Sequence, residues 1–129
     1  MNYLLDTQVV IWSLDDDPRL SPAAKDAIEN IQNTVSITIV SLWEIALKRS
    51  IGKLELSANL KDIQNLVSSK SVSILPITVA HLETLEALAH QEKHRDPFDR
   101  LILSQAITEN LTLISSDTHF KDYPVQVLW

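Results

Sequence analysis

Four acidic residues stand where elements of secondary structure are expected to begin or end: Asp6, Glu44, Asp99 and Asp117. Asp6 and Asp117 follow short apolar segments, whereas Glu44 and Asp99 lie in the first turns of expected helices. Carboxylates that share a pocket raise one another's pKa and destabilise the fold. A hard divalent cation such as Mg²⁺ or Mn²⁺ prefers oxygen ligands, and it can activate water and stabilise charge on a phosphodiester. The pattern therefore indicates a candidate metal site.

Each of the four carboxylates also has a structural explanation. Asp6 is suited to cap the helix that follows it. Glu44 stands three residues after Ser41, which is the spacing of a capping box. Asp99 lies near a helix N-terminus, where the helix dipole favours acids, and Asp117 is suited to stabilise a turn. Taken singly, each residue favours the structural explanation, and the pattern alone leaves both open.

Other polar residues accompany these acids. Asp96 followed by Pro97 is typical of a helix N-cap, and we interpret Asp96 first as structural. Basic residues that could hold RNA phosphates beside a metal follow Glu44 or flank Asp96; an equally open interpretation is ordinary surface ion pairs. These residues are Lys48, Arg49, Lys53, Arg95 and Arg100.

The elements that must position these residues alternate between strands and helices. Apolar runs predict strands over residues 2–5, 34–38, 72–77, 111–115 and 125–129. Helical patterns and caps predict helices over 7–14, 22 to about 32, 41–50, 60–69, 78 to about 90, and from 97 onward. This alternation predicts an α/β fold with a mostly parallel sheet. Sites in such sheets lie beyond the carboxyl ends of the strands, where Asp6 and Asp117 are expected.

Composition restricts the function further. The 129 residues fit one domain over 1–129, and the absence of cysteine excludes disulfides and zinc–thiolate sites. The single glycine, Gly52, excludes glycine-rich nucleotide-binding loops. A net charge of −6 argues against nucleic acid unless the acids gather at a metal. We expect a cytoplasmic protein without a membrane segment, because the sequence has neither a signal-peptide pattern nor a long apolar run.

Five segments occur in order at intervals typical of one family. They are Leu4-Leu5-Asp6-Thr7, Ser41-Leu42-Trp43-Glu44-Ile45-Ala46-Leu47-Lys48, Gly52-Lys53-Leu54, Arg95-Asp96-Pro97-Phe98-Asp99-Arg100-Leu101-Ile102 and Ser116-Asp117-Thr118-His119-Phe120. Together they resemble PIN-domain proteins of the VapC toxin type, in particular the subgroup with an RDPFDR segment. The resemblance spans nearly the whole chain.

The resemblance implies an α/β/α sandwich and Mg²⁺- or Mn²⁺-dependent hydrolysis of RNA. Asp6, Glu44 and Asp99 match the main acidic cluster of the family, and Asp117 matches its fourth, more variable acid. Thr7 matches a hydroxyl residue that often supports the first aspartate. Family members usually pair with a small antitoxin protein, and they often form homodimers.

Four further positions receive an interpretation from the same motifs. Asp96 belongs to the subgroup segment, and we interpret it as structural or as acting through the metal ligands. Arg95 and Arg100 flank the acids of that segment and are candidates for RNA contacts. Relatives often have threonine at the position of Ser115, so the serine keeps a hydroxyl group there.

Two other classes of function fit parts of the sequence. One is a PIN-like binding or regulatory module without catalysis, against which the complete set of four acids speaks. The other is a phosphotransfer or phosphatase domain on an α/β sheet, which would need an aspartate that accepts the phosphoryl group. Lack of divalent-metal binding would support the first, and incorporation of a phosphoryl analogue the second.

Overall fold

Five strands form the centre of the computed structural model, which describes residues 1–70, 72–90 and 96–129. The strands are β1 (Asn2–Leu5), β2 (Thr34–Thr38), β3 (Ser73–Leu75), β4 (Thr112–Ile114) and β5 (Val127–Leu128). The helices are α1 (Thr7–Leu14), α2 (Pro22–Glu29), α3 (Ile39–Ser50), α4 (Leu60–Ser69), α5 (Val79–Ala87), α6 (Pro97–Thr108) and the 3-10 helix η1 (Thr118–Asp122). The predicted alternation of strands and helices is confirmed.

The sheet has the strand order β3-β2-β1-β4-β5, and each neighbouring pair is parallel. The expected mostly parallel sheet is therefore entirely parallel among the described strands. β1 lies at the centre, with β2 on one side and β4 on the other, so the chain reverses its direction of winding there. In doubly wound sheets the crevice at this switch point, beyond the carboxyl ends of the strands, is the usual place for a site.

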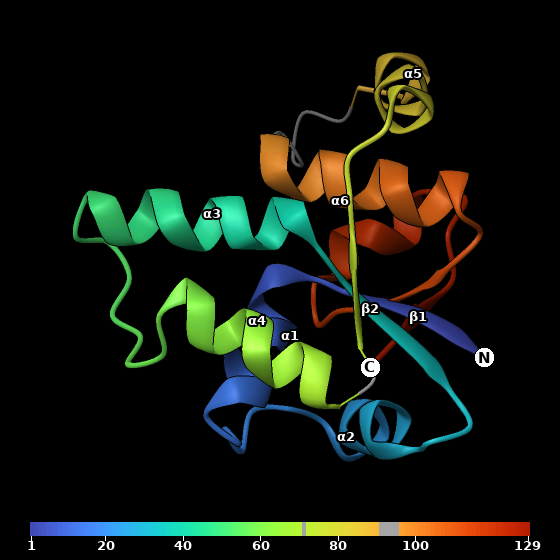
Figure 1. Ribbon diagram of the computed structural model, residues 1–129. Helices are drawn as coiled ribbons and strands as arrows, with labels where there is room; N and C mark the ends of the chain where they lie inside the picture. Colours follow the sequence, from blue (N-terminus) through green and yellow to red (C-terminus); the bar gives the residue numbers. More distant parts are fainter. Residues whose placement is uncertain (71, 91–95) are drawn as a thin grey trace.

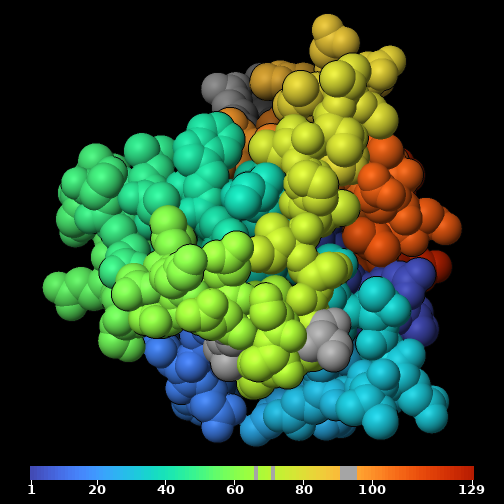
Figure 2. Space-filling view, in the orientation of Figure 1, coloured from blue at the N-terminus to red at the C-terminus, as the bar shows by residue number. Residues whose placement is uncertain are grey.

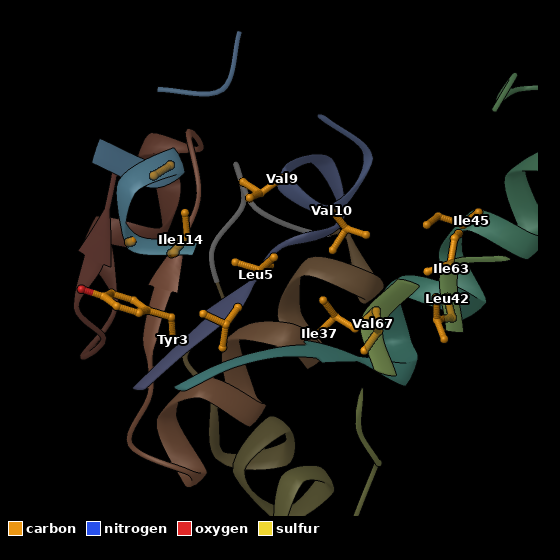
Figure 3. Packing of buried hydrophobic residues seen from close by; sticks show 13 residues of the cluster. Tyr3, Leu5, Val9, Val10, Ile37, Leu42, Ile45, Ile63, Val67 and Ile114 are labelled. Atoms are coloured by element: carbon orange, nitrogen blue, oxygen red, sulfur yellow. The ribbon is translucent and has the colours of Figure 1, made fainter. Parts of the chain in front are cut away.

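Buried apolar side chains cover both faces of the sheet, which makes a three-layer α/β/α arrangement (Figure 1). Neighbouring residues of a strand point to opposite faces. Leu5 and Ile114 accordingly join the core against α1, α2 and α4, which Figure 3 shows at close range. Leu4 and Leu113 join the second core, against α5 and α6. The α/β/α prediction is confirmed.

Helix α3 begins at Ile39, two residues earlier than predicted. Thr38 caps it, because the Thr38 hydroxyl accepts a hydrogen bond from the Val40 amide at 3.1 Å. The predicted capping box of Ser41 and Glu44 is therefore wrong. Ser41 lies inside the helix, where its hydroxyl accepts a bond from Thr7 Oγ1 at 3.0 Å, and Glu44 lies deeper in the helix interior.

Two other helices end earlier than predicted. α2 ends at Glu29 rather than near Gln32, because the Asn30 side chain accepts the Gln32 amide at 2.9 Å and forms a local turn instead. α5 ends at Ala87 rather than near His90, since Leu88 adopts an extended backbone.

Side chains of α4 and of the segment from β3 to α5 form much of the face shown in Figure 2. Among the described residues, no helix combines the length and apolar character needed to span a bilayer.

Candidate metal centre

Asp6 lies directly after β1 and is almost fully buried, with 6% of its surface exposed. Its Oδ1 accepts the Val9 amide at 2.8 Å, so it caps α1 as the structural explanation predicted. Its Oδ2 accepts a hydrogen bond from the Ser115 hydroxyl. The carboxylate is therefore held from two sides, by the helix that follows it and by the neighbouring strand.

Glu44 reaches the same region from α3 and is also buried, with 5% of its surface exposed. Its Oε2 accepts a hydrogen bond from Lys48 Nζ at 2.5 Å. Its Oε1 is buried and has no hydrogen-bond partner among the described residues. A buried carboxylate oxygen without a partner is costly, so this oxygen is suited to a ligand.

Asp96 and Asp99 stand at the start of α6. Asp96 is the N-cap, and its Oδ1 accepts the Asp99 amide at 3.0 Å. The predicted N-cap is therefore confirmed, and Asp96 also lines the cavity described below. The cap holds the first turn of α6 in place, and Asp99 lies in that turn.

Asp117 follows β4 and caps η1. Its Oδ1 accepts the His119 amide at 2.9 Å and lies 3.0 Å from His119 Nδ1. The Asp117 amide donates to the Ser115 hydroxyl at 3.0 Å. The expected turn is thus confirmed, and Ser115 ties Asp117 to Asp6.

All four predicted acids line one cavity of about 360 Å³. The acids come from the ends of β1 and β4 and from helices α3 and α6. The rest of the lining adds a fifth acid, Asp96, and mixes hydroxyl, amide, basic and apolar side chains: Thr7, Gln8, Ile11, Ile45, Lys48, Lys53, Leu54 and Ser116. Residues far apart in sequence therefore converge at the switch point of the sheet.

Burial and crowding of like charge perturb two of these acids. Burial raises the pKa of Asp6 to about 6, with smaller contributions from the charges of Asp117 and Glu44, and the bonds from Ser115 and Val9 oppose the rise. Burial also raises the pKa of Asp99 to about 7, and the charges of Asp96 and Glu44 add to it. The cavity is therefore a site where additional positive charge would be stabilised.

The donor set fits a hard divalent cation, because the acids around the cavity offer oxygen ligands and Glu44 Oε1 has no other partner among the described residues. No three His, Asp or Glu side chains in the described ranges are grouped closely enough to hold one ion among themselves. Mg²⁺ usually keeps several waters and binds through one or two carboxylates plus substrate phosphate. The residues present fit that incomplete protein coordination.

The predicted basic and hydroxyl residues separate into two groups. Lys48, Lys53 and Thr7 line the cavity, although the Thr7 hydroxyl bonds to Ser41 rather than to Asp6. Arg49 and Arg100 instead donate to main-chain carbonyls, Arg49 to Ala58 at 2.7 Å and Arg100 to Leu88 and Ala89 at 3.3 and 3.2 Å. Arg95 lies outside the described residues.

Sequence reasoning missed the role of Ser115 as the donor to Asp6, although it noted the hydroxyl. Leu5 pairs with Ile114, so the next residues, Asp6 and Ser115, come side by side. A hydroxyl at the end of one strand and an acid at the end of another would be the signal, but it is informative only once the register is known. Gln8 and Ser116 were also not singled out, and both line the cavity.

A larger depression of about 600 Å³ lies at the opposite, amino ends of the strands. Asn2, Thr112 and Gln126 are among its lining residues, and no charged side chain is. The smaller acidic cavity is the stronger site candidate, because it combines the switch-point position with perturbed carboxylates.

Comparisons with known proteins agree with this architecture. Ribonuclease VapC22 of Mycobacterium tuberculosis is 29% identical over 122 residues, which cover 93% of this chain and 90% of that protein. A solved structure of VapBC2 from Rickettsia felis, bound to a DNA fragment from their promoter, is similar with a TM-score of 0.73 and 23% identity, over 100% of this chain and 99% of that one. VapBC-1 from nontypeable Haemophilus influenzae is similar with a TM-score of 0.73 and 18% identity, over 99% and 97% of the two chains.

The sequence profile of the PIN domain matches residues 3–126. This match includes all five acids that line the cavity, from Asp6 to Asp117. The chain therefore belongs to the PIN-domain family.

Proposed function

We propose that this protein is a Mg²⁺- or Mn²⁺-dependent endoribonuclease, the toxin of a toxin–antitoxin pair of the VapC type. The observation that carries this proposal is the convergence of four carboxylates on one cavity at the switch point of a parallel sheet. The similarity to Ribonuclease VapC22 supports RNA as the substrate. The segment from Arg95 to Arg100 favours the RDPFDR subgroup.

Asp6 and Asp99 are the principal metal ligands in this proposal. Asp6 is held rigidly by its two hydrogen bonds, and Asp99 is placed by the cap of α6. Glu44 binds the metal or orients the attacking water through its unpartnered Oε1. Asp117, whose Oδ1 already accepts from His119, completes the site through water.

The bound cation would supply an activated water and charge stabilisation for in-line attack on a phosphodiester. The protein's part is to hold the carboxylates in place and to accept the substrate backbone. Lys48 and Lys53 lie on the wall of the same cavity and are the described basic residues placed to contact a phosphate. Arg100 is a weaker candidate, because its guanidinium is occupied by the end of α5.

A protein partner is the second part of the proposal. Four apolar side chains spaced four residues apart lie exposed along α3 and its C-cap, and they are Ile39, Trp43, Leu47 and Ile51, exposed by 39%, 52%, 43% and 58%. Trp43 also packs edge-on against Phe98, with ring centroids 4.6 Å apart. Such a row on a helix is typical of a protein interface, which fits a homodimer or an antitoxin complex.

Cleavage of RNA tests the enzyme. Purified protein should cleave a mixture of cellular RNAs with Mn²⁺ or Mg²⁺ present and should stop on addition of a chelator. Asp6→Asn and Asp99→Asn should lose activity while keeping the circular dichroism spectrum. Asp26→Asn, at an exposed position on α2, is the matched control and should remain active. Full activity in both cavity variants would contradict the assignment.

Metal binding tests the site without knowledge of the RNA target. Mn²⁺ should raise the melting temperature of the wild type, because a ligand that binds only the folded state stabilises it by about 2.7 kcal/mol at 100 times its Kd. The rise should vanish in Asp99→Asn. No rise in the wild type would favour a binding module without catalysis.

Size-exclusion chromatography with light scattering tests self-association. The wild type should elute as a dimer at micromolar concentration, whereas replacement of Trp43 and Leu47 by serine should give monomers. A wild-type monomer would leave α3 as a surface for the antitoxin alone.

Expression of the wild type in bacteria should arrest growth, and expression of Asp6→Asn should not.

A further inference from the structure

Lys48 makes an unusual contact for a residue at the wall of a proposed metal site. Its ammonium lies 2.5 Å from Glu44 Oε2, one helical turn earlier on α3. The Glu44 side chain is 6% exposed, whereas that of Lys48 is 43% exposed. A half-exposed cation therefore reaches inward and neutralises one oxygen of a buried carboxylate.

The charge of Lys48 also acts on the other acids of the cavity. Besides Glu44, the acids whose charges act on Lys48 are Asp96 and Asp99, at the start of α6. Lys53 lines the same cavity but has no ion pair among the described residues. Lys48 is therefore the described basic residue whose ammonium is committed to a cavity carboxylate.

We propose that Lys48 is a displaceable countercation, which pairs with Glu44 Oε2 in the metal-free protein and moves away when a divalent cation binds the open Oε1, because the two positive charges repel each other. This inference rests on the proposed metal site and adds a competition for Glu44 within it. A lysine is suited to the role, because its ammonium sits on a flexible stem and can leave towards solvent. The released ammonium remains at the cavity mouth, where a substrate phosphate must enter.

Competition of this kind lowers the affinity of the protein for the metal. Removal of Lys48 should therefore strengthen Mn²⁺ binding, although a basic residue near a bound RNA should favour activity. Loss of Lys48 should thus raise the affinity for Mn²⁺ but lower the cleavage of RNA. Loss of a residue that only helps to build the metal site would lower both.

Calorimetric titration with Mn²⁺ tests the proposal on wild type, Lys48→Met, Lys48→Arg and Lys53→Met. Lys48→Met should bind Mn²⁺ about tenfold more tightly, since a hydrogen bond to a charged group no longer has to be broken. Lys48→Arg should stay near the wild type, because it keeps the ion pair. Lys53→Met should change the Mn²⁺ affinity by less than about threefold, because the charge of Lys53 acts on the site only at a distance and is screened by solvent and salt.

Three outcomes would overturn the inference. Equal tightening in Lys48→Met and Lys53→Met would mean a general effect of charge. Unchanged or weaker binding in Lys48→Met would mean that Lys48 does not compete with the metal. If the wild type bound no Mn²⁺, the proposed metal site would fail as well, so the two failures are distinguishable.

A second measurement uses the unaltered protein and does not depend on the variants folding. Amine-reactive labelling followed by mass spectrometry should show a higher ratio of Lys48 to Lys53 modification with Mn²⁺ than with chelator, because the Lys48 ammonium is released. An unchanged or lower ratio would contradict displacement.

Discussion

The Ser115 hydroxyl donates a hydrogen bond to Asp6 Oδ2, although 109 positions separate the two residues in the chain. The parallel pairing of Leu5 with Ile114 makes them neighbours at the carboxyl ends of β1 and β4. The same hydroxyl accepts the Asp117 amide at 3.0 Å. One serine therefore positions two of the five cavity acids.

Replacement of Ser115 by alanine should weaken metal binding. It removes the donor that lowers the pKa of Asp6 and leaves the buried Asp6 Oδ2 without that hydrogen bond. Loss of a residue that orients a metal ligand typically costs about 10- to 100-fold in affinity. Calorimetric titration with Mn²⁺ measures it. Ser115→Thr keeps the hydroxyl and should bind like the wild type; equal affinity in the alanine variant would show that Asp6 needs no such support.

The metal-free protein should be less stable at alkaline than at mildly acidic pH. The pKa values of Asp6, about 6, and of Asp99, about 7, lie above the ordinary value of 3.8, so the folded state binds more protons than the unfolded state between these limits. The contribution of these two groups to the free energy of unfolding is fully present below their ordinary pKa, and it decreases as the pH rises through about 6 and 7. Urea unfolding with chelator at about pH 5 and about pH 8 measures the difference.

The variant Asp99→Asn is the control for this pH dependence. An amide cannot ionise, so the loss of stability at alkaline pH should be smaller, and at about pH 8 the variant should be more stable than the wild type by on the order of 1 kcal/mol. A wild type that gained stability between about pH 5 and pH 8 would show that other groups dominate.

Asp96 should act through its cap rather than as a metal ligand. Asp96→Asn keeps an oxygen that accepts the Asp99 amide, so its free energy of unfolding should stay near that of the wild type. Its Mn²⁺ affinity should stay within a few-fold of the wild type. Asp96→Ala removes the cap and should cost about 1 kcal/mol. Thermal unfolding and titration of the two variants check this. A large loss of affinity in Asp96→Asn would instead make Asp96 a ligand.

Gln105 should be critical for stability although it lies outside the cavity. It is fully buried on α6, accepts from Thr38 Oγ1 at 2.5 Å and donates to the Pro76 carbonyl at 3.1 Å. Gln105→Leu removes the acceptor of the Thr38 hydroxyl proton and the side-chain donor to the Pro76 carbonyl, and it should cost about 2 to 4 kcal/mol in the free energy of unfolding. Urea denaturation measures the cost. Gln64→Leu on the exposed side of α4 is the matched control, and an equal effect there would rule out the buried network as the cause.

Much of this protein followed from local chemistry that the sequence carries by itself. Strand and helix types and the caps Asp6 and Asp96 involve residues within a few positions of one another. The Lys48–Glu44 pair is also local, since the two residues stand four apart on one helix. The boundary of α3 was mispredicted, because Thr38 and Ser41 are equally plausible caps until the strand before them is placed.

The tertiary structure decided which of the acids meet, and how. Strand order and register are collective choices, since a slip by one residue would turn each side chain to the opposite face. Only the observed register brings Asp6 beside Ser115, and only the packing of α3 and α6 on the sheet carries Glu44 and Asp99 to the same cavity. The sequence determined which carboxylates were available, and the long-range packing of the core determined that they share one site.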